Sequence, residues 1–357
     1  MIINKYITGL SCLLILTSTN TIADDGTGNI ECPIVPSDVQ QCSTAGALLP
    51  DLMTVVPKHL GLQNKQQQEV LRFTNAMANL GNGPWWLEPE FPDAPTGQTC
   101  QAAYQLITAP EHFPDRHIIP TDEQIPAPAG TFLDRCQKGQ FDYHETHNHW
   151  HIANVGDFKV CHYDEFIVGN DSNGKAIVDI DCAPVERPGP DPHDDPETIG
   201  VKFTFCLVDW YKLGDNSPNS DYTRNFFACE TGFQGVAPGW ADQYHHSTDG
   251  QDIDITGLAP SRYVLVSNVN AEVFGSPLFQ EMDYDNNASW SVFDLTRESQ
   301  GNPKIKLVED ACSDTYSFLE TVIQPAAQRF VDYYHDGDER FRDIIIDDMC
   351  GGKTLNR

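Results

Sequence analysis

Basic residues are scarce in this chain. Lys and Arg together number 22 against 52 Asp and Glu, which gives a formal net charge of −30 at pH 7. Nucleic acid is bound by surfaces of the opposite sign, so the composition argues against nucleic acid as a partner. A negative surface attracts cationic partners such as Lys-rich proteins or polyamines, although the same charge also suits a surface adapted for solubility.

Long hydrophobic runs are also missing beyond the first residues. Residues 1–23 contain Lys5, an apolar run through Leu16 and a small-residue site at Thr21–Ala23, a pattern typical of a secretory signal peptide. That run is too short to span a membrane comfortably, and no other segment approaches its length. We therefore expect an exported protein, secreted or periplasmic, with no membrane span.

No C-x-x-C pair occurs, which disfavours a thiolate zinc site. The chain has 11 cysteines, and Cys12 lies in the predicted signal. The remaining ten form an even set that an oxidising compartment would pair. They are Cys32, Cys42, Cys100, Cys136, Cys161, Cys182, Cys206, Cys229, Cys312 and Cys350.

Short apolar stretches punctuated by Gly, Pro, Asn and Asp predict a mainly β fold, a β-sandwich-like domain over 24–300. Long loops are expected over 97–139, 181–200 and 213–250. A C-terminal extension, 301–357, has helical periodicity at Tyr316–Tyr334 and Phe341–Met349. The expected strand runs are Leu48–Val56, Glu69–Asn79, Trp85–Glu88, His147–Phe158, Phe158–Phe166, Val201–Asp209, Gln251–Ile255, Tyr263–Val269 and Ala288–Leu295.

Residues 144–151 hold four histidines. His147, His149 and His151 recur at every second position, so on a β-strand their side chains point to one face. Three imidazole nitrogens on one face nearly complete the shell of a transition metal such as copper or zinc. The spacing fits neither the helical H-E-x-x-H pattern nor a cupin or H-x-H-x-D-H hydrolase. The alternative is a His-rich loop without a ligand role.

Four segments, in order over roughly residues 45–295, resemble the catalytic domain of lysyl oxidases, which are copper amine oxidases. His147–His151 is similar to the H-x-H-x-H copper run of that family, and Lys202–Leu207 to its K-x-S-F-C-L segment with Thr for Ser. Gln234–Gly239 with Asp252–Thr256 is similar to its Q-G-x-x-P-G and I-D-I-T blocks. Glu281–Asn287 is similar to its E-S-D-Y-T-N-N segment.

The resemblance implies copper at His147, His149 and His151. It also implies a lysine tyrosylquinone cofactor made by cross-linking Lys202 to Tyr244. Such a cofactor converts primary amines to aldehydes with release of ammonia and hydrogen peroxide. Lys202 lies in an apolar run, and burial would lower the pKa of its amine. A general base should lie near Tyr244. The sequence does not choose among Asp242, His245, His246 and Asp249.

The resemblance also implies calcium, which prefers hard oxygen ligands. The implied ligands are Asp51, Leu52, Glu281, Asp283, Asn286 and Asn287. An Asn/Asp-rich turn between strands is the alternative reading of the second segment.

Several positions depart from the family pattern. Thr146, Trp240 and Gly250 stand where animal members carry cysteines, so the disulfide pairing cannot be copied across. An acidic, Pro-rich insert at Cys182–Gly200 separates the histidine run from Lys202. Two other functions therefore stay open: a catalytically inactive metal-binding β-sandwich serving in adhesion or copper binding, and a zinc hydrolase. Neither needs Lys202 or Tyr244.

Overall fold

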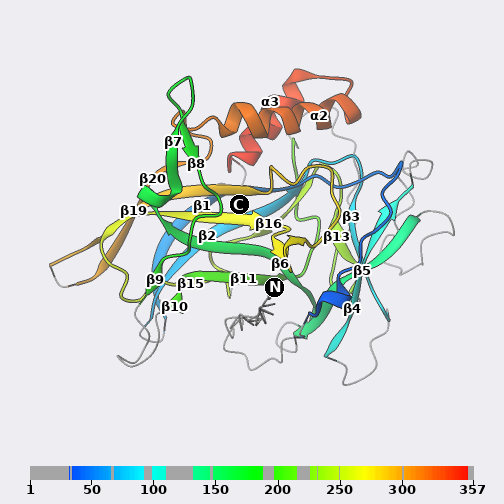
Figure 1. The fold of residues 1–357 in the computed structure, drawn as a ribbon, viewed down its shortest axis with the longest axis horizontal. Helices are drawn as coiled ribbons and strands as arrows, with labels where there is room; N and C mark the ends of the chain where they lie inside the picture. Colours follow the sequence, from blue (N-terminus) through cyan, green and yellow to red (C-terminus); the bar gives the residue numbers. More distant parts are fainter. Residues whose placement is uncertain are drawn as a thin grey trace, which may run out of the picture.

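The computed structural model describes residues 32, 34–65, 68–91, 99–109, 132–144, 148–187, 197–214, 226–230, 232–248, 250–299 and 301–352. Within these ranges the chain is mainly β, with two sheets and a C-terminal pair of helices, so the predicted fold class is confirmed (Figure 1). The predicted signal segment and residues 188–196 of the acidic insert lie outside the described residues.

The smaller sheet has five strands. In order they are β1 (Leu52–Lys65), β2 (Gln68–Asn79), β14 (Trp240–Tyr244) and β12 (Tyr211–Lys212), with β15 (Asp252–Asp254) also paired to β2. All of these pairings are antiparallel. β1 and β2 are long because their inner residues form an apolar face, and the second sheet packs against that face.

The larger sheet has nine strands. In order they are β13 (Gln234–Val236), β3 (Trp85–Pro89), β4 (Cys100–Thr108), β5 (Phe132–His144), β6 (His149–His162), β16 (Ser261–Val269), β19 (Ala288–Arg297) and β20 (Pro303–Asp310), with β11 (Gly200–Phe205) paired to β6. β4 and the first part of β5 lie inside the region 97–139, which was expected to be a long loop, and β13 and β14 lie inside another, 213–250. Those two loop predictions are wrong.

The two sheets share one apolar core. Its buried residues come from both, and the rings of Phe73 on β2 and Phe158 on β6 lie 5.0 Å apart. At the β1 edge of this interface the Thr54 hydroxyl lies 2.8 Å from the Ser289 hydroxyl of β19, both buried. Burying this alternating apolar face of each strand is the main driving force that holds the sandwich together.

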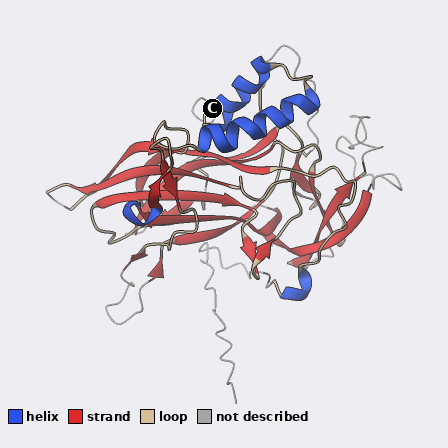
Figure 2. Cartoon of the chain, turned by 45° about the horizontal axis from the view of Figure 1, so that its top comes forward, coloured by secondary structure: helices blue, strands red, loops and turns tan. Residues whose placement is uncertain are grey.

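The predicted C-terminal helices are present. A π-helical turn (Leu319–Ile323) continues into α2 (Gln324–Tyr334), and α3 (Glu339–Met349) follows. Both helices lie over one face of the strands (Figure 2). Ala327, Phe330 and Ile345 share a buried cluster with Val55 of β1 and Trp290 of β19. The Asp338 side chain accepts from the Arg340 N–H and so caps α3.

Minor elements complete the fold. They are a 3₁₀ turn at Pro36–Asp38, α1 (Tyr163–Phe166), and the short pairs β7 (Ile167–Asn170) with β8 (Ala176–Val178), β9 (Glu186–Arg187) with β10 (Glu197–Thr198), and β17 (Glu272–Val273) with β18 (Ser276–Pro277).

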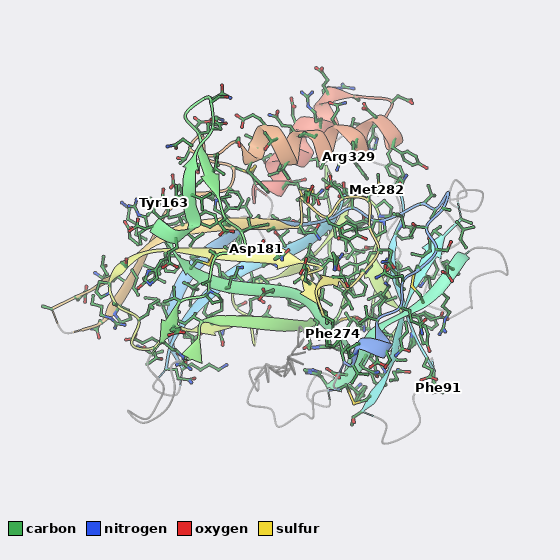
Figure 3. All side chains as sticks on the ribbon, viewed as in Figure 1. Phe91, Tyr163, Asp181, Phe274, Met282 and Arg329 are labelled. Atoms are coloured by element: carbon green, nitrogen blue, oxygen red, sulfur yellow. A yellow bond between two sulfur atoms is a disulfide. The ribbon has the colours of Figure 1, made fainter. Side chains whose placement is uncertain are left out.

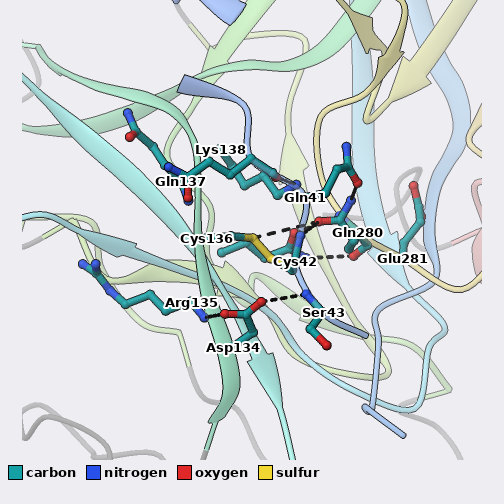
Figure 4. Close-up of a disulfide and its surroundings, with 12 residues drawn as sticks. Gln41, Cys42, Ser43, Asp134, Arg135, Cys136, Gln137, Lys138, Gln280 and Glu281 are labelled. Atoms are coloured by element: carbon teal, nitrogen blue, oxygen red, sulfur yellow. Dashed lines mark hydrogen bonds between the residues drawn. A yellow bond between two sulfur atoms is a disulfide. The ribbon is translucent and has the colours of Figure 1, made fainter. Parts of the chain in front are cut away.

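All ten cysteines outside the predicted signal are paired, as expected for an oxidising compartment. The five disulfides are Cys32–Cys100, Cys42–Cys136, Cys161–Cys182, Cys206–Cys229 and Cys312–Cys350. The second joins the N-terminal arm to β5. Around it, Gln280 accepts from the Cys42 N–H at 3.0 Å, and Asp134 accepts from the Ser43 N–H at 2.6 Å (Figure 4).

Candidate metal and cofactor site

The histidine run enters the sheet at the start of β6. β5 and β6 are antiparallel, with His144 opposite His149 and Phe141 opposite Ile152. Trp150 is buried in the core, while the Nε2 atoms of His149 and His151 lie only 3.0 Å apart. The shared strand face predicted for these two residues is therefore observed. His147 lies outside the described residues, and the ligand role of all three histidines stays a prediction.

His151 has partners that fix the orientation of its ring. Its Nδ1 lies 3.3 Å from the Thr204 hydroxyl of β11, and the His144 ring stacks on it with centroids 3.9 Å apart. Metal-binding histidines commonly contact such a partner through the second ring nitrogen. Two converging imidazole nitrogens with one ring held in this way fit a borderline transition metal such as copper.

β11 lies beside the histidine strand. Lys202 pairs in register with Asp157 of β6, and its side chain is outside the described set. After β11 ends at Phe205, the chain is fixed by the Cys206–Cys229 disulfide and by the Leu207 N–H, which donates to Gln234 at 3.0 Å. The predicted strand at Val201–Asp209 is thus shorter than expected, because the Cys206 and Leu207 N–H groups donate to the side chains of Tyr244 and Gln234 and not to β6.

Tyr244 ends β14 and reaches across to the segment after β11. Its hydroxyl donates to the Cys206 carbonyl at 2.6 Å and accepts from the Cys206 N–H at 3.0 Å. Its ring lies 4.2 Å from that of Phe205. Burial raises the pKa of Tyr244 well above its usual value, and the carboxyl of Asp242 raises it further. The phenol is therefore both fixed in position and kept protonated.

The four candidate bases differ in their surroundings. Asp242, two residues before Tyr244 on β14, is buried, and among the described residues its Oδ2 has no hydrogen-bond partner. Burial raises its pKa well above the usual range, and the nearby Asp209 adds to the effect. His245 and His246 follow the strand and are partly exposed, and burial lowers the pKa of His246. Asp249 lies outside the described residues.

The implied calcium ligands converge from both ends of the chain. Glu281 accepts from the Leu52 N–H and from the Asn287 amide, each at 2.8 Å, while the Asn286 amide donates to Asp51 at 2.6 Å. Within the described part of the chain, the buried Oδ1 atoms of Asn286 and Asn287 have no hydrogen-bond partner. Burial raises the pKa of Asp51, and that of Glu281 to about 8. Buried carboxylates beside unpartnered amide oxygens fit an oxygen-liganded cation.

An arginine from the C-terminal helices already reaches this cluster. Arg329 of α2 donates to Asp51 at 2.8 Å and to Asp283 at 3.2 Å. Figure 3 shows Arg329 on the helix beside the segment that carries Met282. Sequence reasoning missed this residue, since it lies outside the resembling region and no motif marks it.

Cys32, Cys100 and Asp142 lie close together but do not form a metal site. Sulfur atoms of Cys32 and Cys100 lie near a carboxylate oxygen of Asp142, but the two cysteines form a disulfide.

In the described ranges, no helix is both long and apolar enough to cross a membrane.

Comparison with known proteins shows which family part of the chain is similar to. Residues 197–300 match the lysyl oxidase family. Protein-lysine 6-oxidase of Sus scrofa is 31% identical over 156 residues, which cover 44% of this chain and 47% of that protein. The Homo sapiens protein of the same name is also 31% identical, with 28% of its length covered. Lysyl oxidase homolog 3 of Homo sapiens is 28% identical, with 16% covered.

Residues 197–300 are therefore similar to a lysyl oxidase domain. This agrees with the resemblance found in the sequence, and it includes the segment from β11 to β19 that carries Lys202, Tyr244 and the Glu281–Asn287 segment. The chain spans less than half of the length of these curated relatives.

Proposed function

We propose that this protein is a copper- and quinone-dependent amine oxidase that converts primary amines to aldehydes, releasing ammonia and hydrogen peroxide. The observation that carries the proposal is the position of β11 and the residues after it. Thr204 lies against His151, and Cys206 binds the Tyr244 hydroxyl, so one segment contacts both the histidine strand and the tyrosine. Lys202 lies on the same strand.

Copper would be held by His147, His149 and His151, and the quinone would derive from Lys202 and Tyr244. When bound, these groups would supply an electron-accepting carbonyl and a means of using dioxygen. The Cys206 backbone holds the Tyr244 ring in one orientation, and Phe205 excludes water from one side of it. Positioning of this kind lowers the entropic cost of reaction.

Asp242 is the base that the surroundings of Tyr244 favour. It is on the same strand face, two residues away, and its raised pKa makes the carboxylate a stronger proton acceptor than an ordinary aspartate. It would take the proton from the carbon next to the substrate nitrogen. His245 and His246 lie beyond the end of β14 and are partly exposed.

The substrate class follows from charge and from the relatives. The names of the relatives denote oxidation of lysine in proteins, and a net charge of −30 favours cationic amines. We therefore propose peptidyl lysine, with small amines and polyamines as further substrates. The five disulfides support an oxidising location, secreted or periplasmic.

Calcium is proposed as a structural ion held by Asp51, Leu52, Glu281, Asp283, Asn286 and Asn287. The two unpartnered amide oxygens and the buried carboxylates support it.

The cofactor gives the direct test. After copper loading in air, a tryptic digest should contain one branched peptide that joins the Lys202 and Tyr244 segments and reacts with hydrazines. Lys202→Ala and Tyr244→Phe should each reduce amine-dependent peroxide release to background while copper stays bound. Lys159→Ala, on neighbouring β6, is the matched control and should keep both peptide and activity. Unmodified linear peptides from the copper-loaded wild type would contradict the proposal and favour an inactive metal-binding protein.

A further inference from the structure

A second histidine cluster begins at a bulge in β1. The register between β1 and β2 shifts between Val55 and Lys58 and again between Lys58 and Gly61. His59 lies inside this bulge with φ of +53°, a left-handed backbone that non-glycine residues seldom adopt. Bulges re-aim side chains and are common next to functional sites. Here the bulge brings the His59 ring to the residues that follow β14.

His245 and His246 are those residues, and Arg72 of β2 holds their backbone. The Arg72 guanidinium donates to the His246 carbonyl at 2.6 Å and also to the Thr248 carbonyl. Its charge is paired with Asp252 at 3.0 Å. The turn is closed by the Thr248 N–H, which donates to the His245 carbonyl at 2.8 Å. The two histidines are thus presented on a fixed turn.

The three rings converge. One ring nitrogen of each of His59, His245 and His246 lies within 4.8 Å of the others, and the ring centroids are 3.9 to 5.9 Å apart. Nitrogens bound to one tetrahedral zinc ion lie about 3.3 Å apart, because each bond is about 2.0–2.1 Å. Small rotations of partly exposed side chains would close that difference.

Hydroxyl groups fix the orientation of these rings. The Nδ1 of His59 lies 3.0 Å from the buried Thr74 hydroxyl, which also lies 3.4 Å from Nδ1 of His246. The Nδ1 of His245 lies 2.8 Å from the Ser247 hydroxyl. The same kind of outer contact is made by His151 to Thr204, and it is typical of histidines that bind metals.

We propose that His59, His245 and His246 bind a second divalent transition-metal ion, of the zinc–copper class, separate from the ion at the β6 histidines. Three imidazole nitrogens suit these ions, and partial exposure leaves a fourth position for water. The ion would tie the β1 bulge to the turn directly after Tyr244, two segments separated by about 186 residues. The site does not depend on the proposed oxidase activity.

Zinc titration of the full chain tests this proposal. Protein stripped of transition metals and saturated with calcium is titrated with zinc chloride by calorimetry. Every protein carries His149→Ala, which disables the β6 site. The compared variants add His59→Asn, His245→Gln or, as matched control, His162→Gln, a half-buried histidine of β6 outside the cluster. Asn is chosen at position 59 because it tolerates a left-handed backbone.

The His149→Ala protein and the His162→Gln control should each bind one zinc ion and gain thermal stability from it. Both cluster variants should bind zinc at least tenfold more weakly and lose that gain. Circular dichroism checks that each variant is folded, and either cluster variant alone suffices. Equal binding by all proteins, or no binding by the His149→Ala protein, would overturn the proposal. Neither result depends on the cross-link between Lys202 and Tyr244, so failure of the zinc proposal can be distinguished from failure of the oxidase proposal.

Discussion

The two histidine clusters on the sheets are assembled in different ways. His149 and His151 come from one strand, two residues apart, so alternation along β6 alone brings their nitrogens together. His59, His245 and His246 are brought together by a bulge in β1 and a turn after β14. A local pattern can be found by reading the sequence, whereas a cluster made by long-range packing cannot. Tyr244 ends β14 and directly precedes His245 and His246 of the second cluster in sequence.

The largest expected effect is a loss of catalysis that leaves metal binding at both histidine clusters unchanged. Asp242→Asn should lower amine-dependent peroxide release by about 10²–10⁴-fold, because the variant cannot accept the substrate proton. Copper content and the Lys202–Tyr244 peptide should be unchanged. In the wild type the rate should rise with pH through the elevated pKa of Asp242, since only the carboxylate accepts a proton. Steady-state peroxide assays across pH measure both effects.

Gln243→Ala is the matched control for this variant, since its side chain leaves the opposite face of β14. It should keep the wild-type rate and pH profile. Full activity of Asp242→Asn would remove the aspartate from the mechanism and return the role of base to the histidines after Tyr244.

A smaller effect tests whether the clusters are independent. Thr204→Val should weaken copper binding at the β6 site by about 10–100-fold, because His151 loses the hydroxyl that orients it. Thr74→Val should weaken zinc binding at His59, His245 and His246 by a similar factor. Each variant serves as the control of the other. Competition titrations with copper and calorimetry with zinc measure the pair, and a variant that weakens both ions equally would show one coupled site.

The fold was readable where the pattern was local. Alternation located β2, β16 and β19 within a few residues, and an even cysteine count implied full pairing. β4 and β5 were missed because Gly97, Gly130 and several prolines around them read as loop residues, although each strand pairs with the strands next to it in sequence. The two expected runs meeting at Phe158 belong to one strand, β6, since β16 pairs with it through that residue. The last residues of the second run, Tyr163–Phe166, form the helix α1 and not a strand.

The site divides along the same line. His149 and His151 are visible as an alternation, and Tyr244 only through a family resemblance. His59 and Arg329 had no signal at all, because a lone histidine in a strand and a lone arginine in a helix are ordinary residues. Only the bulge and the helix packing give them a role. The residues whose roles depend on contacts between distant segments are thus the ones that the sequence alone does not reveal.

The smallest expected effect concerns the acid–amide cluster formed by Asp51, Glu281, Asp283, Asn286 and Asn287. This cluster is also assembled from distant segments, but it already contains a cationic side chain, that of Arg329. Without calcium, Arg329→Gln should lower the free energy of unfolding by about 1 kcal/mol, because a half-exposed arginine stabilises the buried Asp51 carboxylate only modestly. Calcium should restore the loss and raise the melting temperature more in the variant than in the wild type, since the ion no longer competes with a guanidinium.

Arg340→Gln, which removes an exposed ion pair with Asp338 on α3, is the control and should show the same calcium response as the wild type. Thermal unfolding with calcium or with chelator measures all three proteins. If calcium stabilises none of them, Arg329 is the cluster's own cation and the calcium proposal fails. A larger calcium shift in Arg329→Gln alone would show that the helix and the ion compete for the same carboxylates.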